Sequence, residues 1–394
     1  MKFYDTRQRK IIDFKVGSPV NIYVCGITPY DSAHLGHIFT FLTYDLLQRR
    51  LEELGHKVTM VRNITDVDEP IFERARANGE TYQELAERET KKFQSIMHDL
   101  NFRPAASEPL ASDFVLPMAS AIAKLLAGGQ AYKLGNDIYF DVARAADFGK
   151  FCGFSDKLQL TFMLERGGDP GRVGKRQQLD FLLWRGVSDA SDPAAWDSPI
   201  GRGRPGWHIE CSVMSSSILG APLDLHGGGL DLIFPHHECE IAQSQALGLA
   251  PPARHWLHVA PLLLHGEKIS KSLGNLLLAS ALLQNYSPPT IRLSLMHYHY
   301  RIGGEWQPDY LLSAHQLAQK IQTAQKLDNG QTGQAELNAI RADLDNDLDT
   351  PSTLKNLDQL ADKIINARRQ KSANRPTATP LDQALRLLGI AIKP

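Results

Sequence analysis

The sequence contains little cysteine and no long apolar run. Only four of its 394 residues are cysteines (Cys25, Cys152, Cys211 and Cys239), too few and too scattered for a disulfide framework. No apolar stretch is long enough to span a membrane, and the charged start MKFYDTRQRK is not followed by the apolar core of a secretory signal. We therefore expect a cytoplasmic protein without membrane contact, whose cysteines are buried, metal-bound or reactive.

An excess of charge of either sign is also missing. Lysine and arginine number 43 against 44 aspartates and glutamates, a formal net charge of -1. This balance argues against a mainly electrostatic grip on nucleic acid, although a local basic patch can exist within a neutral total. With 43% hydrophobic and 22% charged residues, the chain has an ordinary globular composition. Its length suffices for one large core and a smaller one.

The order of predicted elements indicates an α/β fold. Residues 19–25, PVNIYVC, have the apolar pattern of a buried strand, residues 34–55 have helical spacing that ends at a glycine, and KVTMVRN at 57–63 forms the next strand. Such units build parallel sheets with ligand sites at the carboxyl ends of the strands. We predict a Rossmann-like catalytic domain over residues 1–310 with an insertion at about 115–205, followed by a helical domain over 311–394.

The helix after the first of these strands opens with the motif HLGH. Backbone N–H groups and the helix dipole favour a phosphate there, Gly36 permits its close approach, and the imidazoles of His34 and His37 can donate to developing charge. Taken alone, the pair would more readily be interpreted as capping or core-edge histidines.

A second motif, KISKS at residues 268–272, changes this assessment. Lys268 and Lys271 can neutralise a triphosphate and its leaving pyrophosphate, whereas the alternative is a solvated turn. HLGH after the first strand and KISKS after the last resemble the signature pair of class I aminoacyl-tRNA synthetases. The resemblance implies a class I Rossmann-like fold, ATP with Mg²⁺ as cofactor, and catalytic roles for four residues: His34, His37, Lys268 and Lys271.

Four further residues form a candidate zinc-ligand set: Cys25, Cys211, His236 and Glu240. His236 and Glu240 are four residues apart, which places them on one face of a helix. Two thiolates, one imidazole and one carboxylate suit zinc. Because the spacings match no zinc-finger pattern, Cys239 or His237 could replace one of these residues.

Together with the nucleotide motifs, this set resembles the zinc site of cysteine-activating enzymes, where one zinc per chain receives the substrate thiolate. A thiolate–zinc bond rejects serine because a hydroxyl is a harder and less acidic ligand. In HGGGLDL, Asp231 could bind a ribose hydroxyl, although the segment could also be a tight strand-end turn. The resemblance implies that the following residues contact ATP or the cysteinyl adenylate: Gly26, Ile27, Thr28, Thr40, Asn63, Ile64, Thr65, Trp207, Gly229, Leu230, Asp231 and Leu262.

Two families share this catalytic domain and differ in the acceptor of the cysteinyl group. Cysteinyl-tRNA synthetase charges tRNA-Cys, whereas the mycothiol-pathway ligase joins L-cysteine to the amine of glucosaminyl-inositol. The segments CGITPYD, ERGGDP, GRVGKRQQLDFLLWR and DNDLDTPSTL resemble the ligase, and residues 311–394 are too few for both a helical domain and an anticodon-reading module. We therefore predict a monomeric ligase that acts on an amino sugar.

Two residues disagree with this assignment. Glu240 resembles the synthetase, because the ligase usually has no carboxylate at that position, and Leu230 stands where both families normally have serine. A shortened synthetase that charges tRNA-Cys therefore stays an alternative. A third possibility is a catalytically silent paralogue that binds a partner. The intact HLGH and KISKS motifs and the zinc residues argue against it.

Overall fold

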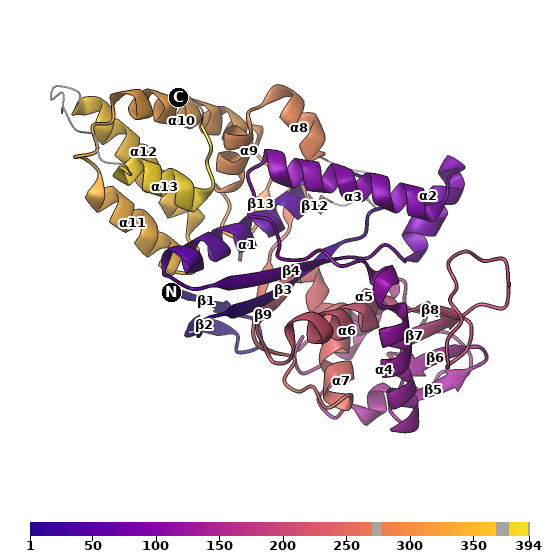
Figure 1. Cartoon of the computed structure of the whole chain (residues 1–394). Coiled ribbons are helices and arrows are strands. Elements are labelled where there is room, and N and C mark those ends of the chain that lie inside the picture. The colour runs from indigo at the N-terminus through magenta and orange to yellow at the C-terminus, as the bar shows by residue number, and fades with distance from the viewer. Residues whose placement is uncertain (270–276, 368–377, 393–394) are drawn as a thin grey trace.

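The computed structural model describes residues 1–269, 277–367 and 378–392. Its centre is a parallel sheet of four strands in the order β10–β9–β3–β4 (Figure 1). These strands are β3 (Val20–Ile27), β4 (Val58–Ile64), β9 (Leu223–Gly229) and β10 (Ala253–Val259). Helix α1 (Leu35–Glu53) connects β3 to β4 as the sequence predicts. The predicted α/β fold with a parallel sheet is thus confirmed.

Helices cover both faces of this sheet. Helix α1 lies on one side, and α6 (Trp207–Leu219) and α7 (Glu238–Ala246) lie on the other (Figure 1). Most of α1 is buried, including the polar residues Asp45 and Arg49, because further helices pack on its outer side. The sheet is consequently enclosed, which explains why the inner strand β3 is buried along almost its whole length.

Two segments with a continuous sequence pattern are each divided in the structure. The helical stretch after residue 68 forms α2 (Glu69–Asn78) and α3 (Tyr82–Asp99), because Gly79 adopts a left-handed conformation and Thr81 starts the second helix with a capping box. The apolar segment HWLHVAPLLL does not form one strand: β10 ends at Val259, and β11 (Leu262–Leu264) begins after Pro261. Strand β11 pairs with β12 (Glu267–Lys268) and β13 (Gly304–Glu305).

The predicted insertion contains a second, antiparallel sheet in the order β5–β6–β7–β8. Its strands are β5 (Ala131–Leu134), β6 (Asp137–Phe140), β7 (Phe181–Gly186) and β8 (Gly203–Pro205), and α4 (Val115–Ala127) and α5 (Asp156–Glu165) accompany them. Strands β7 and β8 are short and lie within a glycine- and charge-rich segment, so the local sequence pattern indicates them only weakly. The hairpin of β1 (Lys2–Asp5) and β2 (Lys10–Asp13) packs beside β10, where the Thr6 N–H donates to the Trp256 carbonyl at 2.9 Å.

Helices follow the sheet region toward the C-terminus: α8 (Ala279–Asn285), α9 (Pro288–Leu295), α10 (Pro308–Leu327), α11 (Gln334–Asp345), α12 (Thr350–Asn366) and α13 (Pro380–Leu388). Side chains from α10 to α13 join those of α1 and the sheet in one cluster of buried apolar residues. Arg292, only 1% exposed, links these parts, since it donates to Asp45 Oδ2 at 2.5 Å and to the Leu388 carbonyl at 2.8 Å. The division at residue 310 stays a prediction.

Within the described ranges, no helix combines the length and apolarity needed to cross a membrane.

Candidate active site and metal centre

The candidate site lies where β3 and β4 end. Cys25 and Gly26 lie near the carboxyl end of β3, and Asn63 lies near the end of β4. A Cβ atom on Gly26 would lie 1.6 Å from the Asn63 carbonyl oxygen, so only glycine fits at this position. The Gly26 N–H donates to Asn63 Oδ1 at 2.9 Å, and Cys211 Sγ lies 3.7 Å from the same oxygen. Asn63 thereby joins the two strand ends to the start of α6.

The four predicted zinc ligands converge in the structure. Cys25 Sγ lies 3.6 Å from Cys211 Sγ and 3.8 Å from Glu240 Oε1. Glu240 Oε1 in turn lies 3.1 Å from His236 Nε2. Their ligand atoms all lie within 4.8 Å of one another, and all four residues are buried. The fold therefore brings together residues that are distant in sequence.

The surroundings of His236 fit a bound metal ion. Its Nδ1 lies 3.1 Å from Nδ1 of His208, while its buried Nε2 faces Glu240 Oε1 at 3.1 Å without a well-aligned hydrogen bond to any described residue. Burial lowers the pKa of His236 well below the usual range, so the imidazole is neutral and offers a lone pair. The Trp207 ring stacks on His236 with centroids 4.4 Å apart. An oriented imidazole beside two thiols and a carboxylate is a donor set that suits zinc.

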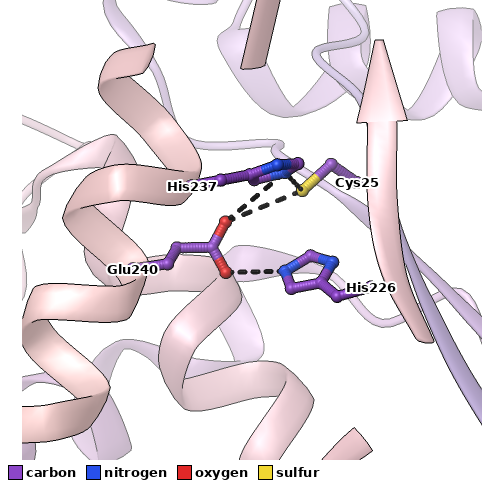
Figure 2. A group of neighbouring side chains, drawn as sticks. All are labelled: Cys25, His226, His237 and Glu240. Carbon is purple, nitrogen blue, oxygen red and sulfur yellow. Dashed lines mark hydrogen bonds and ion pairs between the residues drawn. The ribbon is translucent and has the colours of Figure 1, made fainter. Parts of the chain in front are cut away.

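Cys25 and Glu240 also belong to a second possible ligand group, with His226 and His237 (Figure 2). His226 Nε2 lies 2.8 Å from Glu240 Oε2, and His237 Nε2 lies 3.3 Å from Cys25 Sγ. Figure 2 shows that one oxygen of Glu240 faces the His226 ring and the other faces His237 and the thiol of Cys25. His237, an alternative ligand in the sequence analysis, is thus next to the centre. Cys239 belongs to neither group among the described residues.

Both of these additional histidines are oriented by a hydrogen bond that involves their Nδ1 atom. His226 Nδ1 lies 3.0 Å from the Tyr23 carbonyl, and His237 Nδ1 lies 2.6 Å from His258 Nε2. His258 Nδ1 in turn lies 2.7 Å from Thr6 Oγ1. His226 and His237 can therefore serve either as ligands or as groups that hold Glu240 and Cys25 in place. The sequence analysis assigned no role to His226 or His258, although both occur in strands that end at the site.

The HLGH motif lies next to Ile269, in the described part of KISKS. A Cβ atom on Gly36 would lie 3.7 Å from the carbonyl oxygen of Ile269, within KISKS. Just beyond that motif, the Leu277 carbonyl accepts a hydrogen bond from the Leu35 N–H at 2.9 Å. The His34 and His37 rings stack with centroids 3.8 Å apart at the start of α1. Lys271 lies outside the described residues.

Asp231 connects three of the motifs. Its Oδ2 lies 2.7 Å from Lys268 Nζ and 2.8 Å from Arg166 Nη1. Burial alone would raise the pKa of Asp231, but the charges of Lys268 and Arg166 outweigh it and hold that pKa well below the usual range. The carboxylate is therefore ionised and shared by two cations. The side chain of Leu230 beside it is 44% exposed, and Gly229 ends strand β9.

The remaining predicted contacts differ in what they can offer a ligand. The side chains of Ile27, Ile64 and Leu262 are buried in the apolar core, so only their backbone groups are available, and the Leu262 carbonyl already accepts from Ile269 N–H at 3.0 Å. Thr40 Oγ1 donates to the Gly36 carbonyl at 3.0 Å. Thr65 Oγ1 donates to Glu210 Oε2 at 2.8 Å.

Comparison with known proteins identifies the family. The family described as tRNA synthetases class I (C) catalytic domain matches residues 12–316. The chain belongs to this family. Two similar relatives are named L-cysteine:1D-myo-inositol 2-amino-2-deoxy-alpha-D-glucopyranoside ligase. The relative from Thermobifida fusca is 44% identical over 95% of this chain and 91% of its own, and that from Corynebacterium diphtheriae is 41% identical over 100% and 96%.

Solved structures of class I synthetases share the fold at low sequence identity. Methionyl-tRNA synthetase from Mycobacterium tuberculosis, in complex with methionyl-adenylate, has a TM-score of 0.64 at 15% identity, over 95% of this chain and 88% of that one. A LeuRS from Agrobacterium radiobacter K84, in a ternary complex with tRNA and LeuAMS, has a TM-score of 0.65 at 12% identity, over 95% and 84%. These likenesses confirm the class I fold.

Proposed function

We propose that the protein is an ATP-dependent, AMP-forming cysteine ligase that acts on glucosaminyl-inositol. It activates L-cysteine as cysteinyl adenylate and transfers the cysteinyl group to the amine of the amino sugar. The observation that carries this proposal is the convergence of two thiols, an imidazole and a carboxylate beside the paired HLGH and KISKS motifs. The relatives at 41–44% identity, whose printed name is that of this ligase, support the same acceptor.

In this proposal the chain recognises cysteine through its sulfur. Cys25, Cys211, His236 and Glu240 would hold a zinc ion, which would supply a Lewis acid that prefers a thiolate to a hydroxyl. His208 orients His236 through the contact between their Nδ1 atoms. Burial of all four ligands keeps water away from the donor atoms and makes the selection of cysteine over serine stronger.

The first step is the attack of the cysteine carboxylate on the α-phosphate of Mg-ATP, with departure of pyrophosphate. His34 and His37 donate hydrogen bonds at the start of α1, where the helix dipole also stabilises the phosphate charge. Lys268 and Lys271 neutralise the charge that develops on pyrophosphate. Asp231 holds Lys268 through the ion pair at 2.7 Å, which places this lysine beside the HGGGLDL turn.

The second step is the attack of the acceptor amine on the carbonyl carbon of the adenylate. A C–N bond forms, the acyl–oxygen bond to AMP breaks, and the products are the cysteinyl amide and AMP. Thr28 and Trp207 line a cavity of about 480 Å³ that also contains Arg166, and this cavity offers space for the amino sugar. Glu240 favours a second candidate, a synthetase that charges tRNA-Cys, because it lies among the metal-binding residues where the ligase usually has no carboxylate.

Mass spectrometry of the products tests the proposal directly. The purified protein is incubated with cysteine and Mg-ATP, and with either glucosaminyl-inositol or tRNA; reactions without cysteine serve as controls. We expect cysteinyl amide and AMP only with the amino sugar. Charging of tRNA without amide formation would refute the ligase assignment. Salt gives a second readout, since tRNA binding should weaken by orders of magnitude over a few-fold rise in salt whereas amide formation should change little.

A further inference from the structure

The cavity beside Thr28 and Trp207 is rich in carboxylates. It lies between the start of α2, the segment that follows α5, strands β7 and β8, and the start of α6. Its lining includes six acidic residues: Asp68, Glu69, Glu73, Glu165, Asp169 and Asp180. An amino sugar carries an ammonium group near neutral pH, and this group must lose a proton before it can attack a carbonyl carbon. The contacts of each carboxylate show which of them can receive the ammonium group.

Two of the six carboxylates are fully engaged in structural contacts. Asp180 is buried and accepts hydrogen bonds from the Tyr132 hydroxyl at 2.7 Å and from the backbone N–H groups of residues 142 and 177. Asp169 accepts from the Tyr139 hydroxyl at 2.6 Å and pairs with Lys175 at 3.2 Å. Neither is available to a ligand without the loss of these contacts.

Three others are exposed to solvent. Glu69 pairs with Arg204 at 2.7 Å, while Glu73 and Glu165 lie on the exposed rim of the cavity. Exposed carboxylates keep their water and bind a cation weakly. They contribute negative charge around the cavity but no enclosed acceptor.

Asp68 differs from all five. It is half-buried, and its Oδ1 accepts one hydrogen bond from the Glu69 N–H at 2.9 Å. No lysine, arginine or histidine in the described ranges lies within ion-pair distance of it. It follows β4 at the position directly before α2, so the end of the parallel sheet and the first turn of a helix hold it in place.

We propose that Asp68 binds the ammonium group of the acceptor and accepts its proton in the second step. The Asp68 carboxylate takes one proton from R–NH₃⁺ and becomes a carboxylic acid. The neutral amine then forms the C–N bond to the adenylate carbonyl carbon, AMP leaves with the electron pair of the acyl–oxygen bond, and the nitrogen releases its second proton to water. This assignment rests on the proposed function, since it requires an amine acceptor.

The electrostatic surroundings of Asp68 agree with this role. Burial raises its pKa to about 6; the Glu69 N–H and the charge of Arg204 oppose the rise, and the charges of Glu69 and Glu73 add to it. Buried Glu210 on α6 and Tyr30 on the loop after β3 also face it, and each has a raised pKa. A base with a pKa of about 6 is ionised at neutral pH and still basic enough to assist proton removal.

The test compares Asp68→Asn with wild type in the two steps separately. Pyrophosphate exchange into ATP with cysteine reports adenylate formation, and amide formation with glucosaminyl-inositol reports transfer. We expect normal exchange and amide formation slowed by about 10²–10⁴-fold, the usual range for loss of a positioned base. Glu87→Gln, an exposed residue on α3 outside the cavity, is the control and should retain both steps. Amide formation at the wild-type rate in Asp68→Asn, or loss of exchange in that variant, would overturn the assignment.

Hydroxylamine distinguishes proton acceptance from damage to the site. This small nucleophile is neutral near pH 7 and needs no base, so Asp68→Asn should form cysteine hydroxamate from the adenylate as fast as wild type. The rate of amide formation by wild type should also rise as the pH increases through about 6. This pH dependence should be absent in Asp68→Asn. A variant that loses hydroxamate formation as well would contradict a role in proton transfer. Failure of wild type to make the amide would refute the proposed function instead.

Discussion

The two possible ligand groups at the centre lead to different effects of the same substitution. Cys211 belongs only to the first group, with His236, whereas His226 belongs only to the second. We predict that the first group holds the metal. Cys211→Ser should then remove a ligand, while His226→Ala should remove only the partner that lies 2.8 Å from Glu240 Oε2. Metal affinity in these two variants therefore separates the two groups.

The expected magnitudes follow from the contacts. Structural zinc sites with four ligands bind with roughly 10–16 kcal/mol, so one ligand contributes on the order of 2.5–4 kcal/mol, or about 10²–10³-fold in affinity. Loss of a residue that orients a ligand costs about 10–100-fold, roughly 1.4–2.7 kcal/mol. Cys211→Ser should therefore weaken metal binding by about 10²–10³-fold, and His226→Ala by about 10–100-fold.

Competition with a chelating indicator at fixed pH measures these affinities, and cobalt substitution provides an independent count of thiolates. The charge-transfer absorption from thiolate to cobalt should correspond to two thiolates in wild type and one in Cys211→Ser. Cys239→Ser is the matched control, because this buried cysteine belongs to neither group. Unchanged affinity in Cys211→Ser together with loss of binding in His226→Ala would refute the first group and support the second.

Three further predictions concern stability and the two chemical steps. Arg292→Met should lower the free energy of unfolding by about 1–3 kcal/mol in urea titrations, because it removes one of the two guanidinium partners of the buried Asp45 while Arg49 at 2.8 Å remains; exposed Arg301→Met should cost about 1 kcal/mol or less. Lys271→Ala should slow pyrophosphate exchange far more than it weakens cysteine binding, and equal losses would place Lys271 in ground-state binding. Arg166→Ala should impair amide formation and leave exchange intact, since Lys268 still pairs with the carboxylate that Arg166 contacts; a loss of exchange would contradict this.

The sequence by itself determined the class of the fold and the chemistry of the ATP motifs. Apolar runs at 19–25 and 57–63 with a helical segment between them indicate a parallel sheet, because the spacing of apolar residues along the chain distinguishes strands from helices. HLGH and KISKS are each made of consecutive residues, so each motif can be recognised without any knowledge of packing. Gly36 is one such case: it is visible in the motif, and the structure places it against Ile269.

Other features depended on tertiary structure because they join distant segments. Cys25 and Cys211 are separated by 186 positions, and only the meeting of β3 with α6 brings their sulfur atoms to 3.6 Å. The second ligand group could not be predicted, since His226 and His237 reach the centre from a strand and a helix whose relative placement no local pattern encodes. The same holds for Asp68. The surrounding segment, NITDVDEP, indicates the start of a helix. Only packing against β8 and α6 places Asp68 in a cavity, where it has no ion-pair partner in the described structure.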